Sequence, residues 1–127
     1  MHRSKTSLLS LVTIIILGGI GLLAAETSSV ARVPDKDRSK SNPYQGQVES
    51  AAAGHKLFDQ HCASCHGSLA LGRGRHPNLH SETVRNATTG ELEWLLTNGS
   101  LKKGMPSWSK LPDQQRWQLV TYLKTLQ

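Results

Sequence analysis

The chain is poor in the residues that normally build a protein interior. It has one phenylalanine, two tyrosines and three tryptophans among 127 residues, and only two cysteines and two methionines. No segment alternates apolar and polar residues as a half-buried strand would, so no sheet is expected. A length of 127 residues admits one small domain rather than two. A domain with so small an apolar core usually needs a metal, a covalent staple or another cofactor.

An uncharged run lies near the N-terminus. Residues 8–25 carry no charge and follow a short basic flank that contains Arg3 and Lys5, as in an export signal. These eighteen residues come close to the roughly 20 that a membrane-spanning helix needs. Residues 1–25 therefore fit a cleaved signal peptide and an uncleaved membrane anchor about equally. In both cases the rest of the chain is exported, which predicts a periplasmic protein, either soluble or held at the cytoplasmic membrane.

The next segment, residues 26–50, has a different composition. It is rich in Ser, Lys, Asp and Gln, contains Pro34 and Pro43, and shows no apolar periodicity. Such a composition predicts a flexible linker. With a retained anchor, this linker would let the domain move roughly 25–30 Å from the membrane. The folded domain is then expected over residues 51–127.

The two cysteines belong to a Cys-x-x-Cys-His motif formed by Cys62, Cys65 and His66. The spacing also suits a disulfide, a thioredoxin-like redox pair or half of a zinc site. A redox pair needs a preceding strand and a zinc site needs a second pair of ligands, and the sequence shows neither. Two thiols on one helical turn can bond the haem vinyl groups while the following imidazole reaches the iron. We therefore predict one haem c, attached through Cys62 and Cys65, with His66 as an iron ligand.

Met105 is the candidate for the second iron ligand. Apart from the initiator it is the only methionine, and Gly104 and Pro106 place it in a turn rather than in a periodic apolar segment. A methionine that only fills the core would be expected in such a segment. A thioether ligand raises the haem potential and closes the second axial position, which suits electron transfer. A bis-histidine site is the less favoured alternative, with His55, His61, His76 and His80 as candidates.

Three main helices are expected, which predicts an all-α domain whose long loops wrap the cofactor. The first covers residues 51–66, where Gly54 indicates the close approach of another backbone. The second starts at the capping box formed by Thr88 and Glu91 and ends before Gly99. The third starts at Pro112 and carries on one face Leu119, Tyr122, Leu123 and Leu126.

Most of the folded domain resembles a class I c-type cytochrome of the short bacterial kind. The family places a glycine eight residues, and an aromatic residue four residues, before its first haem cysteine, as Gly54 and Phe58 stand here. Its C-terminal helix carries a Leu-x-x-Tyr pair, which Leu119 and Tyr122 match. Its Gly-Met-Pro-x-Trp string is matched by residues 104–108. These matches together are far more specific than the cysteine motif alone.

The resemblance spans residues 54–126 and implies the fold and the electron-transfer function of that family. It implies that the carbonyl group of Pro77 accepts a hydrogen bond from the ring N–H of His66, which would fix the tautomer of that ligand. Trp94 and Trp108 fit two interpretations about equally. Each side chain can contact the haem edge or a propionate, and each can simply pack in the core.

Basic residues predominate in the domain. From residue 51 onward, nine Lys and Arg stand against five Asp and Glu, a net charge of +4 before the haem propionates are counted. A basic ring around the haem edge would attract an acidic redox partner, while ordinary solvated surface charge explains the same residues equally well. No nucleic-acid-binding motif is present, and no nucleic-acid partner is expected. The basic residues that could form the ring around the haem edge are Arg73, Arg75, Lys102, Lys103 and Lys110.

The sequence therefore predicts a periplasmic carrier of single electrons with a His/Met-ligated haem c and no catalytic activity of its own. The alternative is a haem subunit of a larger periplasmic dehydrogenase or terminal oxidase complex, in which the same domain passes electrons onward. A haem sensor or peroxidase ranks third, because it needs an open axial position that Met105 would close.

Overall fold

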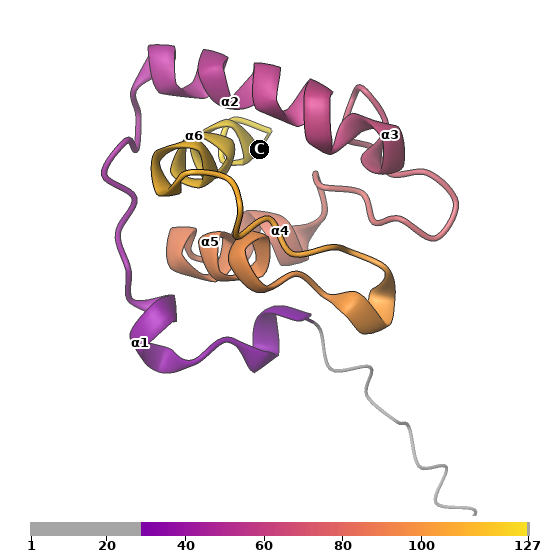
Figure 1. Cartoon of the computed structure of the whole chain (residues 1–127), viewed down its shortest axis with the longest axis horizontal. Helices are drawn as coiled ribbons and strands as arrows, with labels where there is room; N and C mark the ends of the chain where they lie inside the picture. Colours follow the sequence, from indigo (N-terminus) through magenta and orange to yellow (C-terminus); the bar gives the residue numbers. More distant parts are fainter. Residues whose placement is uncertain (1–28, 127) are drawn as a thin grey trace, which may run out of the picture.

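The computed structural model describes residues 29–126, and every named element in that range is a helix (Figure 1). The three longest are α2 (Val48–His61), α5 (Thr89–Asn98) and α6 (Asp113–Leu123). Apart from two isolated β-bridges, the described residues form no extended pairing. The expected all-α fold with three main helices is confirmed. The shorter elements are η1 (Ser29–Arg32), α1 (Asp35–Arg38), α3 (Ala63–His66), α4 (Glu82–Asn86) and η2 (Leu101–Lys103).

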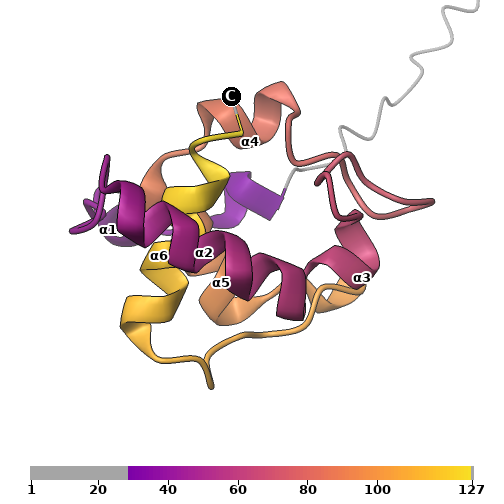
Figure 2. The ribbon, with the colours of Figure 1, turned by 90° about the horizontal axis from the view of Figure 1, so that it is seen from above.

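Helices α2 and α6 cross in close contact, and Gly54 makes this crossing possible (Figure 2). A Cβ atom at Gly54 would lie 2.0 Å from the carbonyl oxygen of Gln118 and 2.9 Å from Cβ of Tyr122. Only glycine fits, which confirms the predicted close approach of another backbone. One turn further along α2, Phe58 is 1% exposed, and its ring centroid lies 5.3 Å from that of Tyr122. This crossing forms the centre of the core.

Helix α5 begins at the predicted capping box. The hydroxyl oxygen of Thr88 accepts a hydrogen bond from the backbone N–H of Glu91 at 3.1 Å, and the Glu91 carboxylate accepts one from the backbone N–H of Thr88 at 2.6 Å. The helix ends at Gly99, whose φ of 70° lies in the left-handed region that favours glycine. Helix α6 begins directly after Pro112, as predicted. Both helix starts are confirmed.

The first predicted helix is longer and less continuous than expected. It starts at Val48 rather than at residue 51, and it ends at His61. The backbone at Cys62 leaves the helical region, with φ of −120° and ψ of −34°, and α3 follows as a separate turn over residues 63–66. The cysteine motif thus stands on a turn of its own, set at an angle to α2 (Figure 1).

Residues 29–47 form a folded segment, here called the N-terminal strap, instead of the predicted linker. The strap passes along α5 and leads into α2 (Figure 1). Val33 and Asp37 in it are 4% and 8% exposed. It packs so tightly on Gly90 that a Cβ atom there would lie 2.0 Å from the Asp37 carbonyl oxygen. The predicted linker over residues 26–50 is therefore corrected for residues 29–50.

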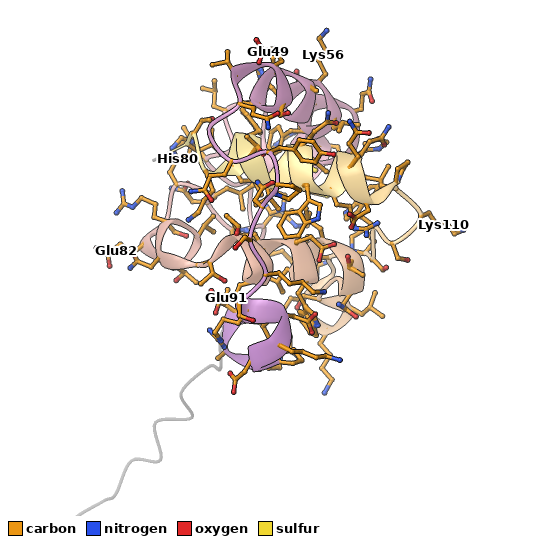
Figure 3. All side chains as sticks on the ribbon, turned by 90° about the vertical axis from the view of Figure 1, so that its left-hand side faces the viewer. Glu49, Lys56, His80, Glu82, Glu91 and Lys110 are labelled. Carbon is orange, nitrogen blue, oxygen red and sulfur yellow. The ribbon has the colours of Figure 1, made fainter. Side chains whose placement is uncertain are left out.

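Polar side chains explain how a segment without apolar periodicity packs in this way. The Arg38 guanidinium pairs with the buried carboxylate of Glu91, which lies beside α1 in Figure 3. The Thr88 hydroxyl donates to the Arg38 carbonyl oxygen at 2.8 Å. The Asn42 side-chain amide donates to the Thr121 hydroxyl at 2.9 Å, which attaches the strap to α6. Hydrogen bonds and a buried ion pair leave no periodic signature, so a search for apolar periodicity misses them.

The predicted signal peptide or anchor, residues 1–25, lies outside the described residues, as do residues 26–28. In the part that the structure describes, no helix has both the length and the apolar character that a membrane crossing requires. The two N-terminal alternatives stay predictions.

Candidate functional site

The cysteine motif forms one hydrogen-bonded turn at the end of α2. The backbone N–H groups of Cys65 and His66 both donate to the carbonyl oxygen of Cys62, at 3.1 and 2.9 Å. Both cysteines are free thiols, Cys62 half-buried and Cys65 exposed. Two thiols and one imidazole thus stand on a single turn, which is the arrangement that covalent haem attachment uses.

The environment of Cys62 disfavours a thioredoxin-like redox pair. Burial, and to a smaller extent the neighbouring Cys65, raise the pKa of the Cys62 thiol to about 11. A redox pair needs the opposite shift, because only a lowered pKa supplies the reactive thiolate near neutral pH. Within residues 29–126, no group of three or more His, Cys, Asp or Glu side chains is arranged so that it could hold a metal ion.

The ring of His66 is oriented by Pro77. Its Nδ1 atom lies 3.0 Å from the Pro77 carbonyl oxygen, the contact that the family resemblance implies. When Nδ1–H donates to this oxygen, the neutral ring keeps its free lone pair on Nε2. A metal-binding histidine commonly uses such a bond to fix its tautomer and to increase its basicity. The residues present therefore suit His66 as a ligand of haem iron.

A tight turn brings Pro77 back to His66. The backbone N–H of Gly72 donates to the His66 carbonyl oxygen at 2.8 Å. Arg73 and His76 then exchange both backbone hydrogen bonds, at 3.2 and 2.9 Å. Gly72 has a φ of 86°, and a Cβ atom there would lie 2.7 Å from the His76 carbonyl oxygen. The glycines that the sequence shows in this loop thus have a specific use, since they let the chain fold back on the motif.

Met105 lies in a loop over residues 100–105, here called the Met105 loop, that is closed by backbone hydrogen bonds. Ser100 and Met105 exchange N–H to carbonyl bonds at 2.9 and 3.2 Å. The Met105 side chain is half-buried and packs against the hydrophobic core. Gly104, with a φ of 83°, makes the turn that precedes it. A Cβ atom at Gly99 would lie 2.7 Å from the Met105 carbonyl oxygen, so the two ends of this loop are in direct contact.

The two predicted tryptophans lie in different surroundings. Trp108 follows the Met105 loop, packs partly buried against the core and lies with its ring centroid 5.2 Å from that of His61, next to the cysteine motif. Trp94 lines a cavity of about 250 Å³ between the strap and the Met105 loop. The described lining of that cavity includes Ser100 but neither cysteine. The geometry thus favours Trp108 over Trp94 as a neighbour of the haem.

The cysteine turn, the loop over residues 67–81 and the Met105 loop lie at the same end of the molecule in Figures 1 and 2. A Cβ atom at Gly104 would lie 3.3 Å from a guanidinium nitrogen of Arg75, so the two loops approach each other directly. The contact between His61 and Trp108 joins the end of α2 to the segment that follows the Met105 loop. The structure therefore gathers the predicted ligand residues, which are spread over more than 40 positions of the sequence, at one end.

The other histidines considered as iron ligands each contact another residue of the described part of the chain. His55 stacks on Tyr122 with ring centroids 4.7 Å apart, and its Nε2 lies 3.8 Å from the Asp59 carboxylate. The Nε2 atom of His80 lies 3.0 Å from the carbonyl oxygen of Leu69. The ring of His76 lies edge-on to His66, at a centroid distance of 6.3 Å. None of these arrangements favours a bis-histidine site over Met105.

Apolar side chains around the motif suit a large hydrophobic prosthetic group. They pack against the core on one side yet keep part of their surface exposed, which is how residues at the edge of an apolar binding site behave. They come from the position directly after α2, from the loop after the motif, from α4, from the Met105 loop and from the segment between that loop and α6. These partly buried residues are Cys62, Leu79, Val84, Met105, Trp108 and Leu111.

The basic residues singled out in the sequence are all exposed, and four of them lie in the two loops at this end. Two of them adjoin His76 and two lie in η2 before Met105, and Lys110 extends outward from the loop before α6 (Figure 3). Their exposure suits the expected docking of an acidic partner and equally suits solvated surface charge. The residues are Arg73, Arg75, Lys102, Lys103 and Lys110.

The sequence did not single out Ser100, although this residue supports the Met105 loop. It is 6% exposed, and its hydroxyl group meets Ser29 and Arg32 of the strap. A serine after a helix-ending glycine is a common loop residue, so no pattern marks it. Its part in the fold follows from its backbone bonds to Met105 and its side-chain contacts with the strap.

A family model described as cytochrome c oxidase, cbb3-type, subunit III matches residues 49–123, more than half of the chain. The solved structure of cytochrome cL from Methylophaga aminisulfidivorans is similar in fold, with a TM-score of 0.60 and 23% identity. The alignment covers 81% of this chain and 70% of that one.

Two curated proteins are similar in sequence. Quinohemoprotein alcohol dehydrogenase ADH IIB of Pseudomonas putida is 31% identical over 84 residues, which are 65% of this chain and 12% of that protein. Cytochrome c-554(547) of Halothiobacillus neapolitanus is 49% identical over 39 residues, which are 31% of this chain and 43% of that protein. The chain thus spans less than half the length of either relative.

Proposed function

This chain belongs to the family of c-type cytochromes described as cytochrome c oxidase, cbb3-type, subunit III, and on that premise we propose that it carries single electrons in the periplasm. It is a class I c-type cytochrome, and an electron carrier that binds haem covalently. The proposal adds one haem per chain, His66 and Met105 as its iron ligands, and no catalytic activity of its own.

Each of the predicted site residues would have a distinct part in holding the haem. The Cys62 and Cys65 thiols would form the two thioether bonds, and His66 would bind the iron through Nε2 while Pro77 holds its Nδ1–H. Haem, when bound, supplies a one-electron ferric/ferrous couple. Met105 would bind the iron through its sulfur, which stabilises the ferrous form and keeps small molecules from the metal.

The observation that carries the proposal is the bond between His66 and Pro77 beside a loop that presents Met105 at the same end. A histidine that only filled space would not need a fixed tautomer, and a methionine that only filled space would not need a loop closed by two backbone bonds. The partners of the remaining histidines further support Met105 over a bis-histidine site.

The ligand assignment is tested by optical spectroscopy of a Met105→Ala variant. The ferric wild type should show the weak long-wavelength band of iron–thioether ligation, and the variant should lose this band and have a lower potential. Leu101→Ala is the matched control, because Leu101 lies in the same loop and is 76% exposed. A Met105→Ala protein with unchanged spectrum and potential would disprove the assignment.

A role as subunit of a larger enzyme is the second candidate. The observation that favours it is the similarity to a segment that makes up 12% of a quinohemoprotein alcohol dehydrogenase, together with the oxidase subunit in the family description. Isolation from membranes in mild detergent distinguishes the candidates. Stoichiometric co-purification with a dehydrogenase or an oxidase supports the subunit, and a monomer that elutes alone supports the carrier.

For docking, we propose that the exposed basic residues guide an acidic redox partner. A Lys102→Glu/Lys103→Glu variant should accept electrons more slowly at low salt, and the difference should shrink as salt screens the charges. Lys56→Glu, exposed on α2 and labelled in Figure 3, serves as the control. Equal rates for both variants would leave the basic residues as ordinary surface charge.

For localisation, we propose export directed by residues 8–25, followed either by cleavage or by retention as an anchor. The mass of the exported protein decides between these alternatives. With a retained anchor, the folded strap leaves only residues 26–28 between the anchor and the domain, so the domain would stay close to the membrane instead of moving 25–30 Å from it as roughly estimated for a random coil.

A further inference from the structure

We propose that the N-terminal strap positions the Met105 loop, with Ser29 and Arg32 as positioning residues that act through Ser100. The inference rests on the proposed function, because it treats Met105 as an iron ligand. It assigns to the strap a role beyond covering α5, namely control of how readily the loop would open and release Met105 from the iron.

The strap reaches the loop through side chains. The hydroxyl oxygens of Ser29 and Ser100 are 2.9 Å apart, and Arg32 donates from Nη2 to the Ser100 hydroxyl at 3.3 Å. These residues are about 70 positions apart in sequence, with separations of 71 and 68. Ser100 itself is 6% exposed. A buried hydroxyl group with two partners from a distant segment links that segment to the base of the loop, and its loss would break both hydrogen bonds.

Ser100 in turn fixes the backbone at Met105. Its N–H and carbonyl groups pair with the carbonyl and N–H groups of Met105, at 2.9 and 3.2 Å. Its N-terminal neighbour Gly99 lies so near the Met105 and Pro106 backbone that no Cβ atom fits. A displacement of residue 100 is therefore transmitted to Met105 without an intervening flexible side chain.

The rest of the loop is weakly held. Residues 101–104 are all exposed, and the cavity of about 250 Å³ lies between the loop and Trp94. The guanidinium group of Arg75, from the loop over residues 67–81, approaches Gly104. A segment with few buried contacts opens more easily than the core, so the contacts at its base determine its opening equilibrium.

The strap is also attached at a second place. A variant there can distinguish an effect on the Met105 loop from an effect on the stability of the whole domain. The Arg38–Glu91 ion pair and the bond from Thr88 to the Arg38 carbonyl group hold α1 on α5. These residues do not contact Ser100 or Met105 among the described hydrogen bonds and ion pairs. Loss of this attachment should lower the stability of the domain without loosening the Met105 loop.

The test measures imidazole binding to the ferric haem protein, because imidazole binds iron only when Met105 has left it. Ser100→Ala, and separately Ser29→Ala/Arg32→Ala, should each increase the imidazole association constant about fivefold, the usual effect of one lost hydrogen bond. Arg38→Ala should lower the denaturant midpoint and leave the imidazole constant within about twofold of the wild type. Ser29→Thr, which retains the hydroxyl group, should behave as the wild type.

The positioning role of the strap and the proposed function on which it rests would fail in different ways. Wild-type imidazole constants in both Ser100→Ala and the double variant would overturn the positioning role, and so would an equal increase in Arg38→Ala. If Ser100→Ala fails to fold, the double variant still decides, because it leaves Ser100 in place. Failure of the proposed function has a different signature, since the ferric wild type would then lack the iron–thioether band or Met105→Ala would retain it.

Discussion

Nδ1 of His66 and the carbonyl oxygen of Pro77 lie 3.0 Å apart, although the two residues are separated by eleven positions and the intervening loop contains three glycines. The turn at Gly72 makes this contact possible, because a side chain there would collide with the His76 carbonyl group. With His66 as the proposed iron ligand, the loop would contribute to the iron site through one backbone oxygen, and its conformation would affect how strongly His66 donates electrons to the iron.

Gly72→Ala should raise the haem potential. The Cβ atom would lie 2.7 Å from the His76 carbonyl oxygen and would displace Pro77, so His66 would lose the acceptor for its ring N–H and bind ferric iron less strongly. We expect an increase of about 20–60 mV in a redox titration, up to a tenfold change in the one-electron equilibrium. Gly74→Ala is the matched control, because Gly74 also has a positive φ but no atom lies within 4 Å of its Cβ position. Equal shifts in both variants would contradict this explanation.

Gly54→Ala should destabilise the domain severely. A Cβ atom only 2.0 Å from the Gln118 carbonyl oxygen cannot be accommodated unless α2 and α6 move apart. We expect a loss of about 3 kcal/mol or more in the free energy of unfolding, measured by denaturant titration, or a failure to accumulate. Ala52→Gly on the exposed side of α2 should cost only about 1 kcal/mol through helix propensity. A Gly54→Ala protein as stable as this control would show that the helices do not cross here.

Tyr122→Phe should change the alkaline stability of the protein. Burial, and to a smaller extent Asp59, raise the pKa of Tyr122 above its ordinary value of 10.0. The folded state then keeps a proton that the unfolded state has lost, so this contribution to stability is complete below about pH 10 and decreases as the pH rises through the higher folded pKa. We expect the variant to lose less stability than the wild type between neutral pH and the region above pH 10. Parallel stability curves would contradict the shift.

Prevention of haem attachment should prevent stable folding. In a Cys62→Ala/Cys65→Ala variant, the half-buried apolar residues around the motif would lack the group that we expect them to bind, and the remaining core is small. We expect loss of the cooperative thermal transition and of most far-ultraviolet helical signal at 25 °C. A cooperative transition like that of the wild type would mean that the protein core suffices without the haem.

The main helices could be predicted because their signals are local. The capping box at Thr88 and Glu91, the end at Gly99 and the start after Pro112 each depend on residues within one turn. The strap could not be predicted in this way. Its packing depends on single polar contacts, such as Asn42 with Thr121, between segments that are distant in sequence. The sequence does contain one helix-start signal here, because Pro34 stands directly before Asp35 at the start of α1. This signal is weak in a segment of low apolar content.

The candidate site was predictable to a similar extent. Cys62, Cys65 and His66 follow from a short motif, and Met105 from the scarcity of methionine together with its turn. The contact of Pro77 with His66 was implied by the family resemblance. The role proposed for Ser100 depends on residues 29–32, which the composition assigned to a linker, so it required the three-dimensional structure.

The covalent attachment of one haem through Cys62 and Cys65 is tested most directly by the mass of the exported protein under denaturing conditions. We expect the mass of the polypeptide, with or without its N-terminal segment, increased by that of a single haem, and loss of the increase in the Cys62→Ala/Cys65→Ala variant. A wild-type chain with the mass of the polypeptide alone, or of the polypeptide with a Cys62–Cys65 disulfide, would contradict it.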